Sequence, residues 1–334
     1  MWKAGDTPWE ENTDWKPYLD IENHILEQGF QENKSTVELD GYYCDLEKYI
    51  QMNKKDPNKQ RPIKRISSVD INKRFRSKQR YILQKPELKP ELAALGWTSA
   101  WSRFLLAAGV FSVIKNEELT ERVEKAADGI LEEGIKHDKQ IEGKWIANEL
   151  RKVKDEDRTI IGLCCVKLFT IESFLYPLLN EVLRESEVQN TGMECVHEFT
   201  TELGKSQGRT LGPFCSLLWF YLYENPSQRL TYIYRTASLT EKNINDYEKH
   251  KGEWMVWIDF SIATKSKTNA LNSQENTIYE IKVRDGGVPG VIDVSTLSGY
   301  PSENEVLIIA GIPYEIKAIN YDDQLKKYFI HIEL

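Results

Sequence analysis

The chain has 334 residues, of which 40% are hydrophobic and 29% are charged, an ordinary balance for a globular protein of about two domains. Its formal net charge of −8 argues against a generic nucleic-acid or membrane-surface binder. No apolar run is long enough to cross a bilayer, so we expect no membrane contact.

The five cysteines are an odd number and include the adjacent pair Cys164 and Cys165, which argues against a disulfide framework and for a reducing compartment. The first residues, Met-Trp-Lys-Ala-Gly-Asp, lack the apolar segment of a secretory signal. We therefore expect an intracellular protein, cytoplasmic or nuclear. Cys195 and His197 have no second Cys/His cluster to complete a zinc site, so we expect no metal.

Residues 1–75 have the pattern of a small α+β domain. Residues 21–29 predict a short amphipathic helix that ends at Gly29. Residues 37–39, 42–46 and 62–66 predict strands separated by polar turns.

Several elements of this region resemble the WWE domain family in order and spacing. They are Trp9, Trp15, Ile21-Glu22, Tyr43-Cys44-Asp45-Leu46, Gln51-Met52-Asn53 and Lys59-Gln60-Arg61-Pro62-Ile63-Lys64-Arg65. The resemblance implies binding of the ADP-ribose units of poly(ADP-ribose), or a plain protein contact. It also implies a pocket lined by Tyr43, Gln51 and Arg61, where an aromatic ring stacks on adenine and a guanidinium binds phosphate. The residues alone leave open that Trp9, Trp15 and Tyr43 are core residues of a small domain.

Residues 76–90 predict an extended linker, because paired prolines and charges follow a basic run. A second domain is expected over residues 91–334, and its first part is helical. A stripe of apolar residues at helical spacing predicts a helix over 117–134, and residues 144–150 and 160–169 continue the helical region.

The segment from Phe169 to Arg184 predicts a helix that starts near Pro177, since proline is tolerated only in the first turn. It resembles the Tyr-Thr-x-Glu-Ser-x-x-Tyr-x-x-Leu-Asn-x-x-Leu-Arg helix of arginine-specific mono-ADP-ribosyltransferases, with Phe169 in place of the first tyrosine. An amphipathic core helix is the alternative that the residues alone leave open.

The last hundred residues alternate like strands after the helical block, which predicts an α+β fold. The expected strands cover residues 230–235, 255–260, 277–281, 291–294, 305–309, 314–319 and 327–332.

A turn-rich loop from Ser295 leads into the strand that starts near Glu305. Strand side chains alternate, so Glu303 and Glu305 are expected to point the same way. Two carboxylates on one face repel each other unless a cation or a developing positive charge lies between them. A solvated Glu-x-Glu at a strand start is the alternative.

Residues 91–334 resemble the arginine-type ADP-ribosyltransferases, whose fold joins a helical part to a mixed β-sheet and whose fingerprint is an arginine strand, a serine strand and a Glu-x-Glu strand. Arg235 occupies the first position, and Glu303-Asn304-Glu305 occupies the third. The resemblance implies NAD as a substrate, a protein acceptor with an exposed arginine, release of nicotinamide, and no metal.

The resemblance also implies roles for individual residues. Glu305 would hold a ribose hydroxyl and stabilise an oxocarbenium-like transition state, while Glu303 would orient and help deprotonate the acceptor guanidinium. Arg235 would bind the NAD diphosphate, and Tyr300 stands where the family's acceptor-recognition aromatic is found. The remaining residues expected to line the NAD site are Tyr234, Ser261 and Thr264.

Two departures from the family pattern leave alternatives open. Thr236 follows Arg235 where glycine is usual, and Ile262 stands where a serine is expected to brace the catalytic glutamate. A one-residue shift would offer Ser261 instead, but strand alternation predicts the wrong face for it. The alternatives to an active transferase are a catalytically degenerate protein that binds ADP-ribose or poly(ADP-ribose), and an NAD glycohydrolase.

Overall fold

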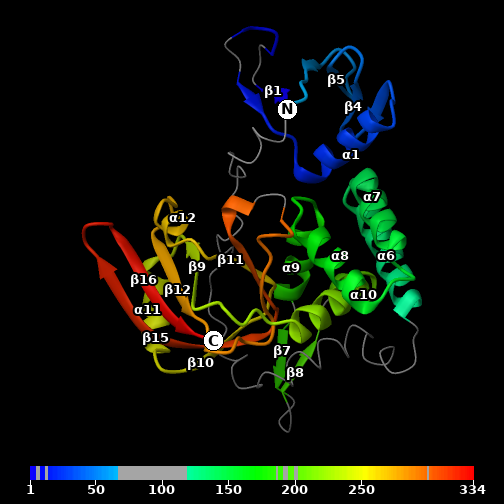
Figure 1. Ribbon diagram of the computed structural model, residues 1–334. Coiled ribbons are helices and arrows are strands. Elements are labelled where there is room, and N and C mark those ends of the chain that lie inside the picture. Colours follow the sequence, from blue (N-terminus) through cyan, green and yellow to red (C-terminus); the bar gives the residue numbers. More distant parts are fainter. Residues whose placement is uncertain are drawn as a thin grey trace.

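The computed structural model describes residues 1–4, 8–11, 14–66, 119–185, 187–190, 195–198, 202–298 and 301–334. The predicted linker over 76–90, both domain boundaries beside it, and Tyr300 lie outside these residues. Figure 1 shows three parts: a small N-terminal module (blue), a layer of helices (green), and a large sheet (yellow to red). This is the α+β arrangement that the sequence predicts.

The N-terminal module packs one helix against a small antiparallel sheet, as predicted. Helix α1 (Asp20–Gln31) covers the sheet β3 (Thr36–Glu38), β4 (Tyr42–Asp45), β5 (Ile50–Asn53) and β6 (Gln60–Pro62), and β1 (Trp2–Lys3) pairs with β2 (Trp15–Lys16). Tyr18, Leu39, Cys44 and Ile63 form its buried core. The sequence pattern did not predict β5, a short polar strand.

The sequence predicts that the helix ends at Gly29. This prediction is wrong, because Gly29 lies inside α1, which continues to Gln31. A Cβ atom on Gly29 would lie 2.2 Å from Cγ2 of Val37 in β3. The glycine is therefore needed for the close approach of helix and strand rather than for a helix cap.

The helical layer contains α6 (Leu119–Lys136), α7 (Gln140–Lys152), α8 (Arg158–Thr170), α9 (Leu175–Glu185) and α10 (Glu202–Glu224). The first four confirm the predicted helices, and Pro177 falls in the first turn of α9. Among the described residues, no single helix is long and apolar enough to span a membrane; α8 and the α9 residues up to Arg184, bent by 92°, pass that test only as a pair. The buried apolar residues of both helices belong to the main hydrophobic core.

The large sheet has the strand order β10-β15-β16-β12-β9-β11-β14-β13. In chain order its members are β9 (Tyr232–Ala237), β10 (Trp254–Trp257), β11 (Ser261–Thr264), β12 (Thr277–Lys282), β13 (Val291–Asp293), β14 (Glu305–Ile308), β15 (Ile312–Asp322) and β16 (Lys327–Glu333). Strands β12 and β16 are parallel and the other pairs antiparallel, so the sheet is mixed, as expected. Strands β9 and β11 meet only at Tyr234 and Thr264.

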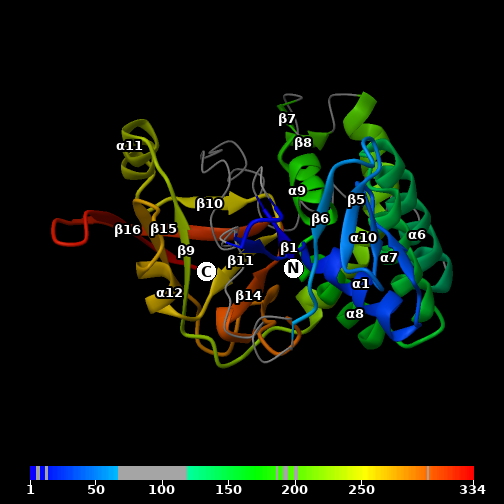
Figure 2. The same cartoon turned by 90° about the horizontal axis from the view of Figure 1, so that it is seen from above.

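The shorter elements complete the described chain. Helices α11 (Glu241–Lys249) and α12 (Lys267–Leu271) pack on the large sheet, and β7 (Glu187–Asn190) pairs with β8 (Cys195–Glu198). Seen from above, the N-terminal module lies over the helical layer, beside the large sheet (Figure 2). Its α1 contacts α7 directly.

Candidate active site

Glu305 is the first residue of β14, and its side chain is 0% exposed. Its strand runs antiparallel to β11, with Glu305 directly opposite Thr264 and Leu307 opposite Ile262. Directly opposed residues project from the same face of a sheet. Glu305 therefore shares a face with Thr264 and Ile262, and the solvated Glu-x-Glu alternative is wrong.

Glu303 is also buried, at 4% exposure, but it is not part of a strand. It ends the 3-10 turn η1 (Pro301–Glu303), and Asn304 between the two glutamates has a positive φ of 51°. Asparagine tolerates this left-handed conformation better than most residues. The sequence-based expectation that strand alternation points both carboxylates the same way is thus corrected. Alternation does not apply to Glu303, because the strand begins only at Glu305.

The end of β11 holds this turn in place. The Thr264 hydroxyl donates a hydrogen bond of 2.7 Å to the Glu303 carbonyl oxygen, and the backbone amide of Lys265 donates to the Asn304 carbonyl at 2.9 Å. On its other side Glu305 is fixed by the amide of Val294, which donates to its carbonyl at 3.0 Å. The Thr264 hydroxyl, predicted to line the NAD site, thus serves here to fix the backbone that carries both glutamates.

Arg235 lies on the other side of the sheet. Its strand partner on β12 is Tyr279, its side chain is 2% exposed, and its guanidinium carbon lies 5.1 Å from the centre of the Trp257 ring. Arg235 donates a hydrogen bond of 2.7 Å to Ser261 Oγ, and its Nε has no hydrogen-bond partner among the described residues. By strand register, Tyr234 and not Arg235 shares the face of Thr264 and Glu305.

Ser261 is buried opposite Ile308, on the face away from Glu305. The prediction that alternation puts Ser261 on the wrong face to brace the glutamate is confirmed. Its hydroxyl donates to Asp259 Oδ1 at 3.3 Å, and Asp259 forms an ion pair of 2.8 Å with Arg184 of α9. Arg235 and Ser261 thus belong to a buried polar network that joins β9, β11 and α9.

Buried tyrosines surround Arg235. Burial raises the pKa of Tyr247 to about 12 although Arg235 lowers it, and the pKa values of Tyr279 and Tyr314 are also raised by burial. Tyr279 donates a hydrogen bond of 3.0 Å to the Tyr247 hydroxyl. The tyrosines therefore stay neutral at physiological pH, and the Arg235 charge is held mainly by hydrogen bonding and by the Trp257 ring.

Tyr234 packs against Ala270 and Ile278, and the Lys267 amino group lies 5.9 Å from the centre of its ring. Burial raises the pKa of its hydroxyl. Ile262, where a serine was expected, is 0% exposed and faces the same side as Glu305. The Glu305 face of β11 consequently offers the hydroxyl of Thr264 but not the serine expected at position 262.

In the N-terminal module, the predicted ligand residues divide between two faces. Gln51 is opposite both Cys44 and Arg61, whereas Tyr43 is opposite Met52. The expectation that Tyr43 lines one pocket with the other two is therefore corrected, because neighbouring residues of a strand point to opposite faces. Tyr43 is 41% exposed, with the Lys54 amino group 5.2 Å from its ring centre.

Gln51 and Arg61 share their face with Tyr42, a residue that the sequence pattern did not single out. By alternation from Cys44, Tyr42 points to this face, and its proximity contributes to the raised pKa of Tyr18, which is due first to burial. The Tyr18 hydroxyl donates to Gln51 Oε1 at 2.5 Å. Counting back two residues from the buried Cys44 would have identified Tyr42 from sequence.

Arg61 completes this face. It donates to the Lys3 carbonyl at 3.1 Å, and its guanidinium carbon lies 5.4 Å from the Trp2 ring centre. The alternative that Trp9, Trp15 and Tyr43 are core residues is wrong for Trp9 and Tyr43, which are 60% and 41% exposed, whereas Trp15 is half-buried. Within the described ranges, no group of three or more His, Cys, Asp or Glu side chains is arranged to hold a metal ion.

Comparisons with solved structures find distant likenesses. The type III effector XopAI from Xanthomonas axonopodis pv. citri is 13% identical, with 75% of this chain and 95% of that one covered and a TM-score of 0.43. An ADP-ribosyltransferase from Clostridium botulinum is 13% identical over 57% of this chain and 92% of its own, with a TM-score of 0.40. The ADP-ribosyltransferase HopU1 of Pseudomonas syringae is 16% identical over 62% and 86%, with a TM-score of 0.39.

The sequence comparisons identify the N-terminal module. No curated protein matches the chain by sequence. The model of the WWE domain family matches residues 8–65, which include α1 and the sheet that carries Gln51 and Arg61. Residues 8–65 are therefore a WWE domain.

Proposed function

We propose that the chain is an NAD-dependent mono-ADP-ribosyltransferase that transfers ADP-ribose to an arginine side chain of a protein. The observation that carries this proposal is the buried carboxylate of Glu305, fixed opposite Thr264. A carboxylate shielded from water stabilises developing positive charge more strongly than a solvated one, and it needs no reorganisation as the charge forms.

In the proposed reaction, the bond between nicotinamide and ribose C1′ breaks, and nicotinamide leaves with the bonding electron pair. Glu305 stabilises the resulting oxocarbenium-like centre, as carboxylates do in glycoside hydrolysis. A guanidinium nitrogen of the acceptor then bonds to C1′ and loses a proton, which Glu303 accepts. An arginine is hardly ever neutral in water, so a carboxylate at contact distance lowers the cost of this deprotonation.

The buried position of Arg235 bears on the NAD contact. Its guanidinium is directed to Ser261 and Trp257, so binding of a diphosphate would require it to leave these partners. In this arrangement Arg235 supports the strand, and the chemistry rests on the two glutamates. NAD is a substrate in this proposal, and no metal takes part.

The experiment uses labelled NAD and a mixture of arginine-containing acceptor proteins. We expect Glu305→Gln to lower protein labelling about a hundredfold or more, the usual effect of losing one preorganised electrostatic partner. The control is Glu315→Gln on β15, where the carboxylate pairs with Lys317 at 2.6 Å near the surface. Equal labelling by the wild type and Glu305→Gln would refute the assignment.

A second candidate function is supported by the positions of Ile262 and Arg235. A site with an apolar side chain on the same face as Glu305, and with its arginine in the core, fits a protein that binds ADP-ribose without turning NAD over. NAD consumption equal to a buffer blank, with ADP-ribose oligomers still bound through the Gln51 face, would favour this function. Free ADP-ribose in excess of labelled protein would instead indicate an NAD glycohydrolase.

A further inference from the structure

Helix α7 is capped by a residue of the WWE domain. The residue before the helix, Lys139, provides no side-chain cap. Asp40 accepts hydrogen bonds from the amides of Ile141 at 2.7 Å and Glu142 at 3.2 Å, across about a hundred residues of sequence. The first amides of a helix have no partner within the helix, and a carboxylate there also interacts favourably with the helix dipole.

A second acidic residue of the WWE domain binds the corner between α8 and α9. Asp20 accepts a hydrogen bond of 3.0 Å from the amide of Glu172, and the amide of Ile21 donates to the Glu172 carbonyl at 3.4 Å. The same corner is held from α7 by the buried Glu142, which accepts from the amide of Phe174 at 3.1 Å. The turn that leads into α9 is thus hydrogen-bonded both to the WWE domain and to α7, the helix that this domain caps.

Apolar contacts accompany these bonds. Ile21 is 0% exposed and belongs to the main hydrophobic core rather than to the core of the WWE domain. The His24 ring stacks on Trp145 of α7, with centroids 5.4 Å apart and planes 21° from parallel. The WWE domain therefore contributes a side chain to the interior of the helical layer, which a tethered but independent domain would not do.

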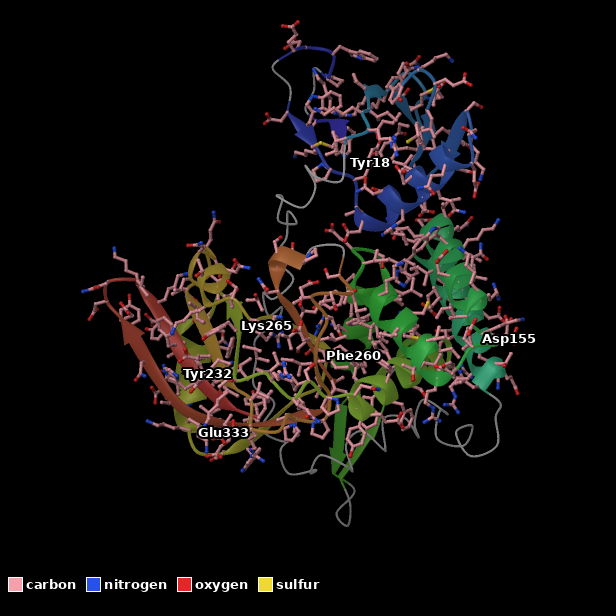
Figure 3. The ribbon with its side chains drawn as sticks, in the orientation of Figure 1. Tyr18, Asp155, Tyr232, Phe260, Lys265 and Glu333 are labelled. Carbon is pink, nitrogen blue, oxygen red and sulfur yellow. The ribbon has the colours of Figure 1, made fainter. Side chains whose placement is uncertain are left out.

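Helix α9 extends from this corner to the strand beside Glu305. Asn180 donates to the Phe260 carbonyl at 2.8 Å and accepts from the Phe260 amide at 3.0 Å, and Arg184 pairs with Asp259. Figure 3 shows Phe260 between the sheet and α9. Residues 259–260 lead directly into β11, whose last residue, Thr264, holds the turn with Glu303.

We propose that the WWE domain is a built-in docking partner of the helical layer, and that its Asp20 and Asp40 position α9 and, through α9, the β11 strand of the candidate active site. The effect on activity rests on the proposed transferase function, whereas the docking does not. Asp20 follows Tyr18 by two residues, and Tyr18 is hydrogen-bonded to Gln51, so a short segment joins the docking residue to the ligand face of the domain. Figure 3 shows Tyr18 within the domain, close to α1.

The test measures amide hydrogen exchange of the full chain by mass spectrometry. The variant is Asp20→Ala/Asp40→Ala, and the matched control is Asp45→Ala. Asp45 lies in the same domain and also accepts two amide hydrogens, from Glu47 and Lys48, but only in its own local turn. We expect the double variant to raise exchange about fivefold or more in residues 141–150 and 171–185, since a lost helix cap has an effect of this size. A smaller rise is expected in 259–264.

Each outcome decides the question. Unchanged exchange in 171–185, or the same change in Asp45→Ala, would overturn the docking proposal. Retained protection in 42–53 shows that the WWE domain itself is still folded. If protection is lost there, Ile21→Ala, which leaves both carboxylates in place, decides instead: raised exchange in 171–185 supports the docking, and unchanged exchange overturns it. Raised exchange together with lower NAD labelling supports both proposals. Raised exchange with no labelling by any variant or the wild type would leave the docking standing and refute the transferase.

Discussion

Arg235 donates a hydrogen bond to Ser261 on the face of β11 that points away from Glu305. The arginine and the glutamate that the family fingerprint pairs thus lie on opposite sides of the strands that carry them. The position of Arg235 in the core gives it a role in stability that can be measured separately from NAD binding.

We expect Arg235→Lys to lower the free energy of unfolding by about 2 kcal/mol or more, because lysine cannot bond Ser261 and cover the Trp257 ring in the same geometry. Urea unfolding measures this loss. The matched control is Arg284→Lys. The Arg284 guanidinium carbon lies 5.4 Å from the Trp254 ring centre at a more exposed site. We expect the loss of unfolding free energy there to be below about 0.5 kcal/mol. Unchanged stability with weaker NAD binding would show that Arg235 acts as a ligand residue instead.

Ile262→Ser restores the hydroxyl that the family pattern has on the Glu305 face. We expect it to lower the free energy of unfolding by about 2–4 kcal/mol, because it leaves a cavity and buries a hydroxyl. We expect it also to raise NAD turnover per folded molecule. Ile308→Ser is the control: Ile308 is equally buried, but it is opposite Ser261 on the other face. Similar turnover in both variants would show that the side chain beside Glu305 does not limit the reaction.

The two faces of β4 predict different effects on ADP-ribose binding. We expect Tyr42→Ala to weaken the binding of ADP-ribose oligomers about tenfold or more, because Tyr42 shares the face of Gln51 and Arg61 and can stack on a base. We expect Tyr43→Ala, on the other face, to change binding less than about twofold. Isothermal titration of the full chain measures both. A larger loss from Tyr43→Ala would contradict the assignment of the ligand face.

Glu22 of α1 lies where the WWE domain meets the helical layer. Burial, and to a lesser degree the nearby carboxylates of Glu142 and Asp40, raise its pKa above the ordinary 4.5, although a backbone hydrogen bond from Leu19 lowers it. A carboxyl with a raised folded-state pKa destabilises the fold once pH rises above that pKa, and it has no such effect below the unfolded-state pKa. We therefore expect Glu22→Gln to increase the free energy of unfolding by about 0.5 kcal/mol at pH 8, with no gain at about pH 4.

The control for this pH effect is Glu27→Gln on the same helix. The Arg65 guanidinium, bound bidentately at 2.7 and 2.9 Å, lowers the pKa of Glu27. The Glu27–Arg65 ion pair stabilises the fold above the unfolded-state pKa of Glu27, and this stabilisation is lost as pH falls. Glu27→Gln should therefore lower the free energy of unfolding slightly at pH 8. Urea unfolding at both pH values gives the two signs. Shifts of the same sign in both variants would contradict the explanation by burial.

The sequence predicted those features that depend on local pattern. The helices from α6 to α9 follow from apolar spacing, and β14 follows from its short β-branched run. Helix α10 was missed because Gly204, Gly208 and Pro213 interrupt the pattern, and burial of residues such as Phe214 and Leu218 supplies the stability that propensity does not. The wrong-face position of Ser261 follows from strand alternation alone, whereas the burial of Glu305 does not.

What could not be predicted depends on contacts between distant residues. The direction of Arg235 follows from how β9 meets β11, and that register is fixed by a single pair, Tyr234 and Thr264. The place of Glu303 in a turn depends on the left-handed Asn304, which a strand-like pattern in the segment hides. The cap that Asp40 forms on α7 joins residues about a hundred positions apart and has no local signal.

Gly29 shows how a missing side chain can act at a distance. Inside an exposed helix, replacing glycine with alanine usually adds roughly 1 kcal/mol of stability. Here the added methyl group would overlap Val37 and lift α1 off β3. The same helix carries Ile21 into the main core. The absence of a side chain at Gly29 therefore determines how closely α1 approaches β3 while Ile21 is buried. We expect Gly29→Ala to destabilise the protein and to loosen the stacking of His24 on Trp145, visible as a change in tryptophan fluorescence.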